Sequence, residues 1–382
     1  MGGRGLGGRY INYHSMKVVH IFHEIKYSGA EIMYNDVIDV FKELGVELVI
    51  VASAKNIGNF ADKFRNKGCE VYHQPYPIFN YYKRIKYYIS FIRFIKEQKI
   101  DLVHNHSSRI FWDTSLCALI AGVKSIYTFH NVFTPNWYSY FYHFSLRIMA
   151  KYIFKCRFQS ISDSVYNNEL KLYKNPTTKI FNWINTNRFF PAVTNEKANI
   201  RKELEIPENA FVLISVGECS KIKRHSDIIK SLSIIKKTIP NIRYLHLGNG
   251  NLLEHEKKIA RKLGVDSSIL FFENQLDVRK FLIASDVYVM TSKFEGISLT
   301  TIEAMACRIP TILYDVPGLR DFNKYKTTSF LIPEKPEAIA EKVIAIYHSN
   351  TETTEIIEQA IANIKLNYNM NSNVKEIFQL YL

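Results

Sequence analysis

The chain has few cysteines, and none of them stands in a pattern that would make it structural. Five occur in 382 residues, with no CxxC pair and no group of His and Cys at the spacing of metal ligands: Cys69, Cys117, Cys156, Cys219 and Cys307. This scatter argues against a disulfide framework and against a zinc site, and it fits a reducing cytoplasm. We therefore expect neither a metal nor another cofactor.

Long hydrophobic runs are also absent. No stretch approaches the roughly 18 to 20 apolar residues that are needed to span a bilayer. The opening MGGRGLGGRYINYHS is glycine-rich and basic without an apolar core, so it is not a secretory signal. We expect residues 1–15 to be a disordered leader, which leaves open whether Met1 or Met16 is the natural start. The remainder is expected to be soluble, or peripheral on the cytoplasmic face of the membrane.

Acidic residues are scarce in the first half of the chain. Residues 1–200 hold 26 Lys and Arg against 14 Asp and Glu, a balance of +12, whereas residues 201–382 hold 24 against 22, a balance of +2. This asymmetry favours an anionic partner for the first half, either nucleic acid or an anionic membrane face. The length itself exceeds that of a single hydrophobic core and predicts two domains.

Short apolar runs alternate with helical segments along the whole chain. The alternation predicts two doubly wound parallel sheets, an α/β architecture, joined near residues 182–199. Ligands of such sheets bind beyond the carboxyl ends of the strands. Strands are expected at residues 16–22, 46–52, 101–106, 124–130, 211–217, 242–248, 268–273, 286–291 and 309–314, with a helix at 30–44.

Residues 81–99 form a basic and aromatic amphipathic segment. With about 100° per residue, one face gathers Tyr81, Ile85, Tyr88, Ile89, Ile92 and Ile95, and we expect this face to contact the core. The opposite face carries three cations together with two aromatics, namely Lys83, Lys86, Arg93, Tyr87 and Phe94. Such a mixture is typical of a helix at a membrane interface. The alternative is an ordinary solvated face; residues 137–158 have the same character.

Two glutamates stand eight positions apart in FEGISLTTIEAMACRIPTI, residues 294–312: Glu295 and Glu303. The segment follows an expected strand, so we predict a loop and then a helix from Thr300, with Glu303 in its first turn. A helix start offers unpaired N–H groups and partial positive charge to an anion, and Gly296 allows close approach. The alternative for Glu303 is a capping box with Thr300. No such structural role is evident for Glu295.

Several segments, in order, resemble retaining glycosyltransferases of family 4. That family has the GT-B fold, in which two Rossmann-like domains face each other across a cleft. The resemblance covers nearly the whole chain from Met16, and it implies an acceptor-binding domain at residues 16–190, joined by a C-terminal helix at 366–382, and a nucleotide-sugar-binding domain at 196–365. The matching segments are MKVVHIF, SGAE, DLVHNH, YTFHN, ISDSV as a serine-bearing strand, FNWINTNRFFP, VGECSKIKRH, EGISLTTIEAMACRIPTI, DVPGLRD and SFLIPEKPEAIAEKV.

The resemblance also implies roles for individual residues. Glu295 would contact the transferred sugar, His130 would line the same pocket, and Lys223 would hold the diphosphate. Glu303 would bind the ribose. The remaining donor-binding positions would be Lys221, Ser28, Gly29, Gly217, Gly296 and the N–H groups of Ile297, Ser298, Leu299 and Thr300.

Two features bear on the diphosphate. Glu218 stands where the family commonly has arginine, so we expect binding to depend on Lys221, Lys223 and Arg224. No Asp-x-Asp occurs, so the Mg²⁺ or Mn²⁺ clip of the other glycosyltransferase fold is missing. A lysine and a helix N-terminus would stabilise the leaving group without a metal. Retention with no evident nucleophile implies a front-face route.

The function expected is retaining transfer of a sugar from a nucleotide-sugar, with a UDP-sugar favoured, to a lipid-linked or free saccharide in capsule, O-antigen or exopolysaccharide assembly. A 2-epimerase of the same fold and a non-catalytic binding module are the alternatives. The basic residues do not form a recognition helix, which argues against nucleic acid. GNGN at 248–251 lacks the third glycine of a dinucleotide fingerprint. A metal role for His104, His106 and His130 is disfavoured because they lie on different strands.

Overall fold

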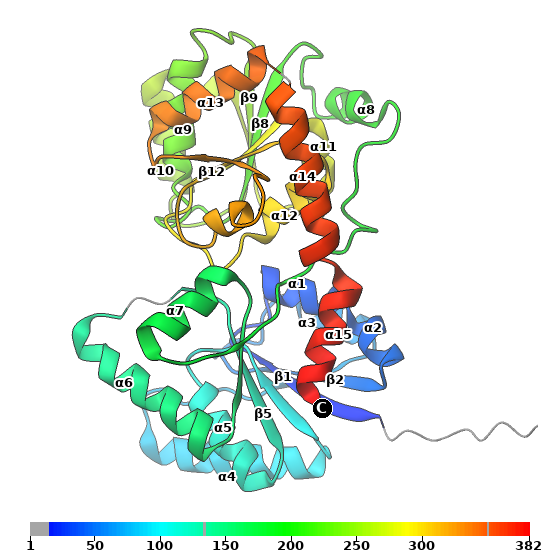
Figure 1. Cartoon of the computed structure of the whole chain (residues 1–382), viewed down its shortest axis with the longest axis vertical. Helices are drawn as coiled ribbons and strands as arrows, with labels where there is room; N and C mark the ends of the chain where they lie inside the picture. The colour runs from blue at the N-terminus through cyan, green and yellow to red at the C-terminus, as the bar shows by residue number, and fades with distance from the viewer. Residues whose placement is uncertain (1–14, 133–134, 350) are drawn as a thin grey trace, which may run out of the picture. The chain divides into compact units, whose positions relative to one another are not determined.

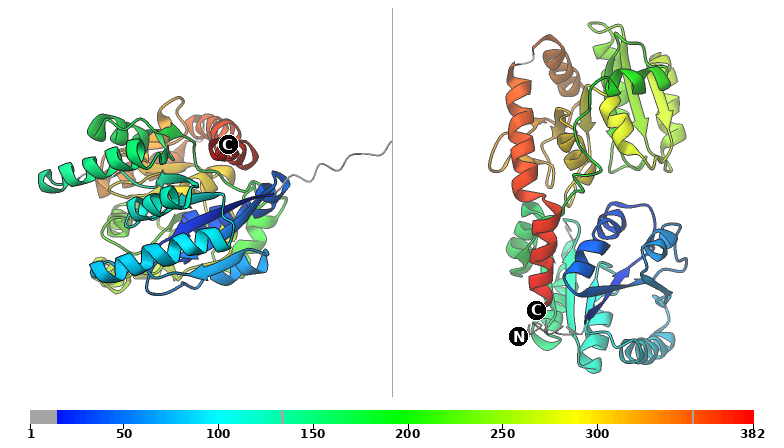
Figure 2. Two further views of the ribbon diagram at one scale, coloured as in Figure 1. Left: turned by 90° about the horizontal axis from the view of Figure 1, so that it is seen from below. Right: turned by 90° about the vertical axis from the view of Figure 1, so that its right-hand side faces the viewer.

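The computed structural model describes residues 15–132, 135–349 and 351–382, so almost all of the predicted leader lies outside the described residues. Two sheets organise the chain, one of seven strands in the order β3-β2-β1-β4-β5-β6-β7 and one of six in the order β10-β9-β8-β11-β12-β13. In both sheets, the described pairs of neighbouring strands run parallel. Helices cover both faces of each sheet (Figures 1 and 2).

The seven-stranded sheet is built around apolar central strands. Its strands are β1 (Met16–Phe22), β2 (Val46–Ala52), β3 (Glu70–His73), β4 (Leu102–Asn105), β5 (Lys124–Phe129), β6 (Arg157–Ser160) and β7 (Thr178–Lys179). Runs such as VELVIVA are buried on both faces, as strands between two helical layers must be. The helices are α1 (Gly29–Asp36), α2 (Ile38–Glu43), α3 (Ala61–Asn66), α4 (Tyr81–Glu97), α5 (Phe111–Ala121), α6 (Trp137–Ile148), which a π-helical turn extends (Met149–Ile153), and α7 (Asp163–Tyr173).

The six-stranded sheet repeats the plan. Its strands are β8 (Phe211–Val216), β9 (Ile242–Leu247), β10 (Ile269–Phe272), β11 (Val287–Met290), β12 (Thr311–Tyr314) and β13 (Phe330–Ile332). Helices α9, α10 and α13 pack together, as do α8, α11, α12 and α14 in pairs. The helices are α8 (Glu196–Glu203), α9 (His225–Ile235), α10 (Leu253–Leu263), α11 (Val278–Ala284), α12 (Leu299–Ala306), α13 (Pro336–His348), α14 (Thr351–Asn367) and α15 (Met370–Tyr381), with 3₁₀ turns at Asp266–Ser268 and Arg320–Asn323.

The predicted architecture is confirmed, with local differences. Every expected strand is present to within two residues at each end, but the expected helix at 30–44 is two helices that meet at Val37. The segment ISDSV is not a strand: β6 ends at Ser160, and the hydroxyl of Ser162 caps α7 by accepting from the Val165 N–H at 3.2 Å. Four strands, β3, β6, β7 and β13, were not expected.

The chain divides into two compact units. The first holds the residues up to Thr128, His143–Arg157 and Ile377–Leu382, and the second holds Phe129–Tyr142 and Phe158–Glu376. Strand β7 and most of β6 belong to the seven-stranded sheet but group with the second unit, so the division into sheets and the division into units do not coincide. The domain limits expected from the sequence therefore stay a prediction. Within the first unit, the buried Tyr381 hydroxyl lies 2.9 Å from His104 Nδ1 and 3.1 Å from His20 Nε2.

The face of α4 that contacts the core is turned from the predicted one: of the predicted core residues, Ile95 is buried and Tyr88 and Ile92 pack against the core while partly buried. Its buried residues are Tyr87, Phe91, Phe94 and Ile95. Three of these are aromatic rings, and they stack in sequence from Tyr87 to Phe94. Aromatic side chains bury more area than isoleucine and gain further from ring contacts, so they take the core positions. The expected core residues Tyr81, Ile85 and Ile89 are instead 80%, 58% and 57% exposed.

In the described part of the chain, no helix combines the length and the apolarity that crossing a membrane requires.

Candidate active site

Two loops at the carboxyl edge of the six-stranded sheet are hydrogen-bonded to each other. The first follows β8 and comprises residues 217–224; the second follows β11 and comprises residues 291–298. The Thr291 hydroxyl donates to the carbonyls of Lys223 (2.8 Å) and Arg224 (3.1 Å), and the Lys293 N–H donates to the Ile222 carbonyl (2.9 Å). Because β8 and β11 are neighbours in the sheet, the two loops form one surface.

An ion pair joins the two loops. The ammonium of Lys223 lies 2.6 Å from Oε1 of Glu295, and both side chains are less than a quarter exposed. The Ser292 hydroxyl donates to the same carboxylate oxygen at 2.5 Å, and the Glu295 N–H donates to the Pro317 carbonyl at 3.0 Å. Charge-assisted bonds of this kind fix a carboxylate in place. The fold thus brings together Lys223 and Glu295, two of the three predicted catalytic residues. Ser292, which was not predicted as a site residue, holds Glu295.

Glycine is required at two positions around Glu295. A Cβ on Gly296 would lie 1.8 Å from the carbonyl oxygen of His130, a residue of the same unit. Gly318 has a φ of +82°, and a Cβ there would lie 2.2 Å from the Glu295 carbonyl oxygen. The backbone of His130 is therefore in contact with the loop that carries Glu295. Burial lowers the pKa of the His130 imidazole to about 4, so the ring is neutral at pH 7.

Helix α12 begins one residue before the predicted start. Ser298 is its N-cap: the Ser298 hydroxyl oxygen accepts from the Thr301 N–H (3.2 Å) and from the Thr301 hydroxyl (2.8 Å). Thr300 lies inside the helix, with its hydroxyl 2.7 Å from that of Tyr288. The predicted capping box of Thr300 with Glu303 is therefore wrong, and Glu303 lies in the second turn. The predicted inward face of the helix, Ile302, Met305 and Ala306, is buried.

The other predicted donor-binding residues are distributed as follows. Lys221 is exposed on the 217–224 loop, which starts at Gly217; Ile297 and Ser298 are buried, and Leu299 opens α12. Ser28 and Gly29 stand at the start of α1 in the first unit, where the Ser28 hydroxyl bonds the Glu31 carboxylate.

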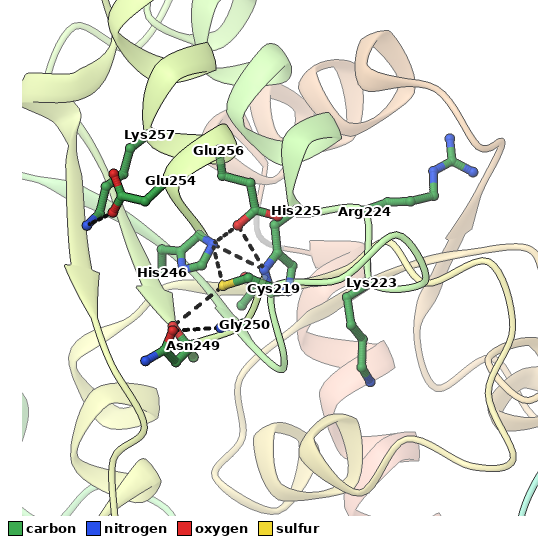
Figure 3. A network of polar contacts seen from close by, with 12 residues as sticks. Cys219, Lys223, Arg224, His225, His246, Asn249, Gly250, Glu254, Glu256 and Lys257 are labelled. Atoms are coloured by element: carbon green, nitrogen blue, oxygen red, sulfur yellow. Dashed lines mark hydrogen bonds and ion pairs between the residues drawn. The ribbon is translucent and has the colours of Figure 1, made fainter. Parts of the chain in front are cut away.

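Arg224, expected to help bind the diphosphate, contacts three other side chains in the structure. Its guanidinium pairs with Asp227 at 2.6 Å and with Glu334, and it lies over the ring of Tyr314. Of the three cations of the 217–224 loop, Arg224 pairs with Asp227 and Glu334, Lys223 pairs with Glu295, and Lys221 is exposed. Figure 3 shows the side chains of Lys223 and Arg224 directed away from each other.

Two family models match the chain in succession. The model "Glycosyltransferase Family 4" matches residues 27–188, and "Glycosyl transferases group 1" matches residues 196–363. The chain belongs to glycosyltransferase family 4. The resemblance seen in the sequence motifs is thereby confirmed.

Curated relatives of this family-4 chain include three bacterial proteins. The putative glycosyltransferase EpsD of Bacillus subtilis (strain 168) is 26% identical over 199 residues, 52% of each chain. The UDP-Gal:alpha-D-GlcNAc-diphosphoundecaprenol alpha-1,3-galactosyltransferase of Escherichia coli is 25% identical over 65% of this chain and 67% of its own. The O-antigen biosynthesis glycosyltransferase WclY of Escherichia coli is 29% identical over 58% and 62%. The matches thus span about half to two thirds of the relatives' lengths.

Solved structures of similar fold match almost the whole chain. A glycosyltransferase from Rickettsia africae ESF-5 superimposes with a TM-score of 0.81 at 19% identity, covering 97% of this chain and 98% of the other. Anabaena Alr3699/HepE, in complex with UDP and glucose, gives 0.82 at 17% identity over 96% and 99%. At these identities the likeness establishes the fold, and the GT-B prediction is confirmed.

Proposed function

We propose that this family-4 protein is a retaining glycosyltransferase that moves a sugar from a UDP-sugar to a lipid-linked saccharide in the assembly of a capsule, O-antigen or exopolysaccharide. The observation that carries the proposal is the Lys223–Glu295 pair at the carboxyl edge of the six-stranded sheet. A cation and a fixed carboxylate at this edge, beside a helix N-terminus, are what a nucleotide-sugar requires.

Each group would act on a different part of the donor. The positive charge of Lys223, with Lys221 and the N–H groups at the start of α12, would bind the diphosphate. Glu295, held by Ser292, would accept hydrogen bonds from hydroxyls of the transferred sugar, and Glu303 would bind the ribose. Glu295 is the counter-ion of Lys223 in the structure. The diphosphate would compete for that lysine.

The transfer itself would proceed on one face of the sugar. The bond from the anomeric carbon to the diphosphate oxygen breaks, and the acceptor oxygen forms a new bond on the same side. The acceptor's proton passes to the departing phosphate oxygen, so atoms and charge balance. Negative charge on the leaving UDP would be stabilised by Lys223 and the α12 N-terminus. Neutral His130 would contribute polar contacts without adding charge.

The choice of a UDP-sugar and of a lipid-linked acceptor is supported by relatives. The alpha-1,3-galactosyltransferase of Escherichia coli is named for transfer from UDP-Gal to a diphosphoundecaprenol-linked sugar. Solved structures of Alr3699/HepE contain UDP or UDP-glucose. These are properties of those proteins, and we propose them for this chain from its sequence similarity to the galactosyltransferase and from the fold that it shares with Alr3699/HepE.

Binding at the cytoplasmic face of the plasma membrane is proposed from the outward face of α4. This face presents Tyr82, Ile85 and Ile89, each more than half exposed, beside the exposed cations Lys86 and Arg93. Apolar side chains among cations favour the interface of an anionic bilayer. Helix α6 adds further exposed aromatics, Trp137, Tyr138, Phe141 and Tyr142. The balance of +12 in residues 1–200 acts in the same direction.

The proposal is tested by incubating the protein with a panel of UDP-sugars, each with and without a lipid-diphosphate-linked saccharide. We expect one donor to be consumed only when acceptor is present, with the sugar recovered on the lipid fraction in the anomeric configuration of the donor. Appearance of an epimer of the UDP-sugar without acceptor would favour the epimerase alternative. Absence of donor binding and of turnover across the panel would favour a binding module.

A further inference from the structure

Four buried side chains with metal-ligating atoms converge in the second unit (Figure 3). Cys219 lies in the 217–224 loop, His225 opens α9, His246 lies in β9, and Glu256 lies in α10. Each is at most 1% exposed. We call these four residues the Cys-His-His-Glu cluster.

The distances in the cluster are those of a ligand set. His246 Nε2 lies 3.0 Å from Glu256 Oε2, 3.1 Å from His225 Nδ1 and 4.0 Å from Cys219 Sγ. All four ligating atoms lie within 4.8 Å of one another. Around a tetrahedral zinc ion with its usual bond lengths, neighbouring ligand atoms are about 3.3 to 3.6 Å apart. Small movements of the side chains would therefore complete such a site.

Hydrogen bonding alone leaves this cluster incompletely satisfied. The Nε2 atom of His246 faces three partners, yet one ring nitrogen carries at most one proton. The outward nitrogens, His225 Nε2 and His246 Nδ1, have no hydrogen-bond partner among the described residues. An ion bound at the inner nitrogens would orient both rings, and these outward nitrogens would keep no partner among the described residues. The carboxylate of Glu256 is also buried, and buried charges are normally paired or bound to a metal.

A second histidine group in the described chain shows what a complete hydrogen-bond network looks like. His104 donates or accepts through both nitrogens, to Tyr381 at 2.9 Å and to Thr128 at 2.7 Å. His20 is bonded through both nitrogens as well, to His106 at 2.9 Å and to Tyr381 at 3.1 Å. This group contains neither a thiol nor a carboxylate, and its inner nitrogens are occupied, so hydrogen bonding accounts for it.

We propose that the Cys-His-His-Glu cluster binds a zinc ion. One thiolate and one carboxylate balance the two positive charges of the ion, so the buried site would be neutral. Thiolate and imidazole ligands favour zinc over magnesium or calcium. Four protein ligands without an open position make the site structural rather than catalytic. The inference is independent of the proposed transfer reaction, which needs no metal at Glu295 or Lys223.

The consequence for the protein is a fixed anchor for the 217–224 loop. The Cys219 N–H already donates to the Asn249 carbonyl and the Leu252 N–H donates to the Cys219 carbonyl, both at 3.0 Å. A Cβ on Gly250 would lie 2.6 Å from the Cys219 carbonyl oxygen, so the two loops are in close contact. An ion bound by Cys219 and His225 would hold the loop on either side of Lys223 to β9 and α10.

Metal content of the full chain, purified without chelator and dialysed against zinc-free buffer, tests the proposal. We expect about one zinc ion per chain, and a loss of at least about tenfold in Cys219→Ser and in His246→Gln. The matched control is Cys156→Ser, which alters another buried cysteine, one in the first unit, and should retain the ion. Circular dichroism establishes that each variant is folded.

Cobalt substitution gives a readout that does not depend on the variants. In the wild-type chain, Co²⁺ bound by the cluster should show a thiolate charge-transfer band and the strong visible bands of tetrahedral cobalt. Zinc added in equal amount should abolish both. A wild-type chain that retains no zinc after gel filtration, and that leaves added cobalt with the spectrum of the hydrated ion, would overturn the proposal.

Discussion

Replacing Lys223 by Met separates the structural from the catalytic contribution of the ion pair. The substitution keeps an unbranched side chain, one heavy atom shorter, and removes its charge. The pair is short, at 2.6 Å, and its members are 23% and 14% exposed. It therefore lies between an exposed pair, which contributes less than about 1 kcal/mol, and a buried pair, in which removing one partner costs about 3 to 5 kcal/mol. Ser292 still holds Glu295, so we expect the free energy of unfolding to fall by about 1 to 2 kcal/mol.

The effect of Lys223→Met on transfer should be larger than its effect on stability. Loss of one group that stabilises a developing anion lowers kcat by about 10²- to 10³-fold, or roughly 3 to 4 kcal/mol. Steady-state assays with a radiolabelled UDP-sugar measure kcat, and urea unfolding measures stability. The matched control is Lys237→Met, which removes an exposed lysine beyond α9. A Lys223→Met protein with kcat within threefold of wild type would refute the role assigned to this lysine.

Three further predictions concern other sites. Gly296→Ala should lower the free energy of unfolding by about 1 to 3 kcal/mol or displace the His130 backbone, because the alanine Cβ would lie 1.8 Å from the His130 carbonyl oxygen. Thermal unfolding measures the stability and a transfer assay measures the turnover; if neither changed, the close contact between Gly296 and His130 would be contradicted. Burial raises the pKa of Glu31 to about 7, above its usual 4.5, so its contribution to stability is largest below pH 4.5 and falls by about 3 kcal/mol as pH rises through 7. Glu31→Gln should remove that slope from unfolding curves measured between pH 5 and 8; an unaltered slope would refute it. The double variant Ile85→Asp, Ile89→Asp should pellet with anionic liposomes at least about tenfold more weakly than wild type, whereas the control Leu366→Asp, at another exposed residue, should pellet like wild type. Equal pelleting of the double variant and wild type would refute a role of α4 in membrane binding.

The strands that could be predicted from the sequence are those with continuous apolar runs. β1, β2, β8 and β9 are buried between helical layers, and burial on both faces leaves a clear pattern. The strands that were missed are short or polar: β6 reads RFQS, with Gln159 and Ser160 buried, and β7 has two residues. Their pairing partners, rather than their own composition, make them strands.

The predicted core face of α4 and the predicted N-cap of α12 differ from the structure for a similar reason. Period alone does not decide whether the isoleucine-rich stripe or the neighbouring stripe of Tyr87, Phe91 and Phe94 faces the core, because both stripes are apolar. In α12, both Ser298 and Thr300 are suitable N-caps, and the backbone is extended at Ser298. In each case the local sequence was compatible with two structures, and tertiary packing determined which of them formed.

The candidate site was partly predictable, because Lys223 and Glu295 each stand in a recognisable motif. Their contact across 72 positions, and the bond from Ser292, depend on β8 and β11 being neighbours. The Cys-His-His-Glu cluster could not be found by spacing, since its members come from a loop, two helices and a strand. The expectation that the chain holds no zinc rested on such spacing.

The measurement that most directly tests the proposed site is transfer of sugar to the lipid-linked acceptor by Glu295→Gln. This variant keeps the size of the side chain and removes its charge, so the protein should fold and still bind donor while kcat falls by about 10²- to 10³-fold. Glu273→Gln, which neutralises an exposed glutamate after β10, is the matched control and should retain full activity. Undiminished transfer by Glu295→Gln would contradict the assignment of the active site to the Lys223–Glu295 pair.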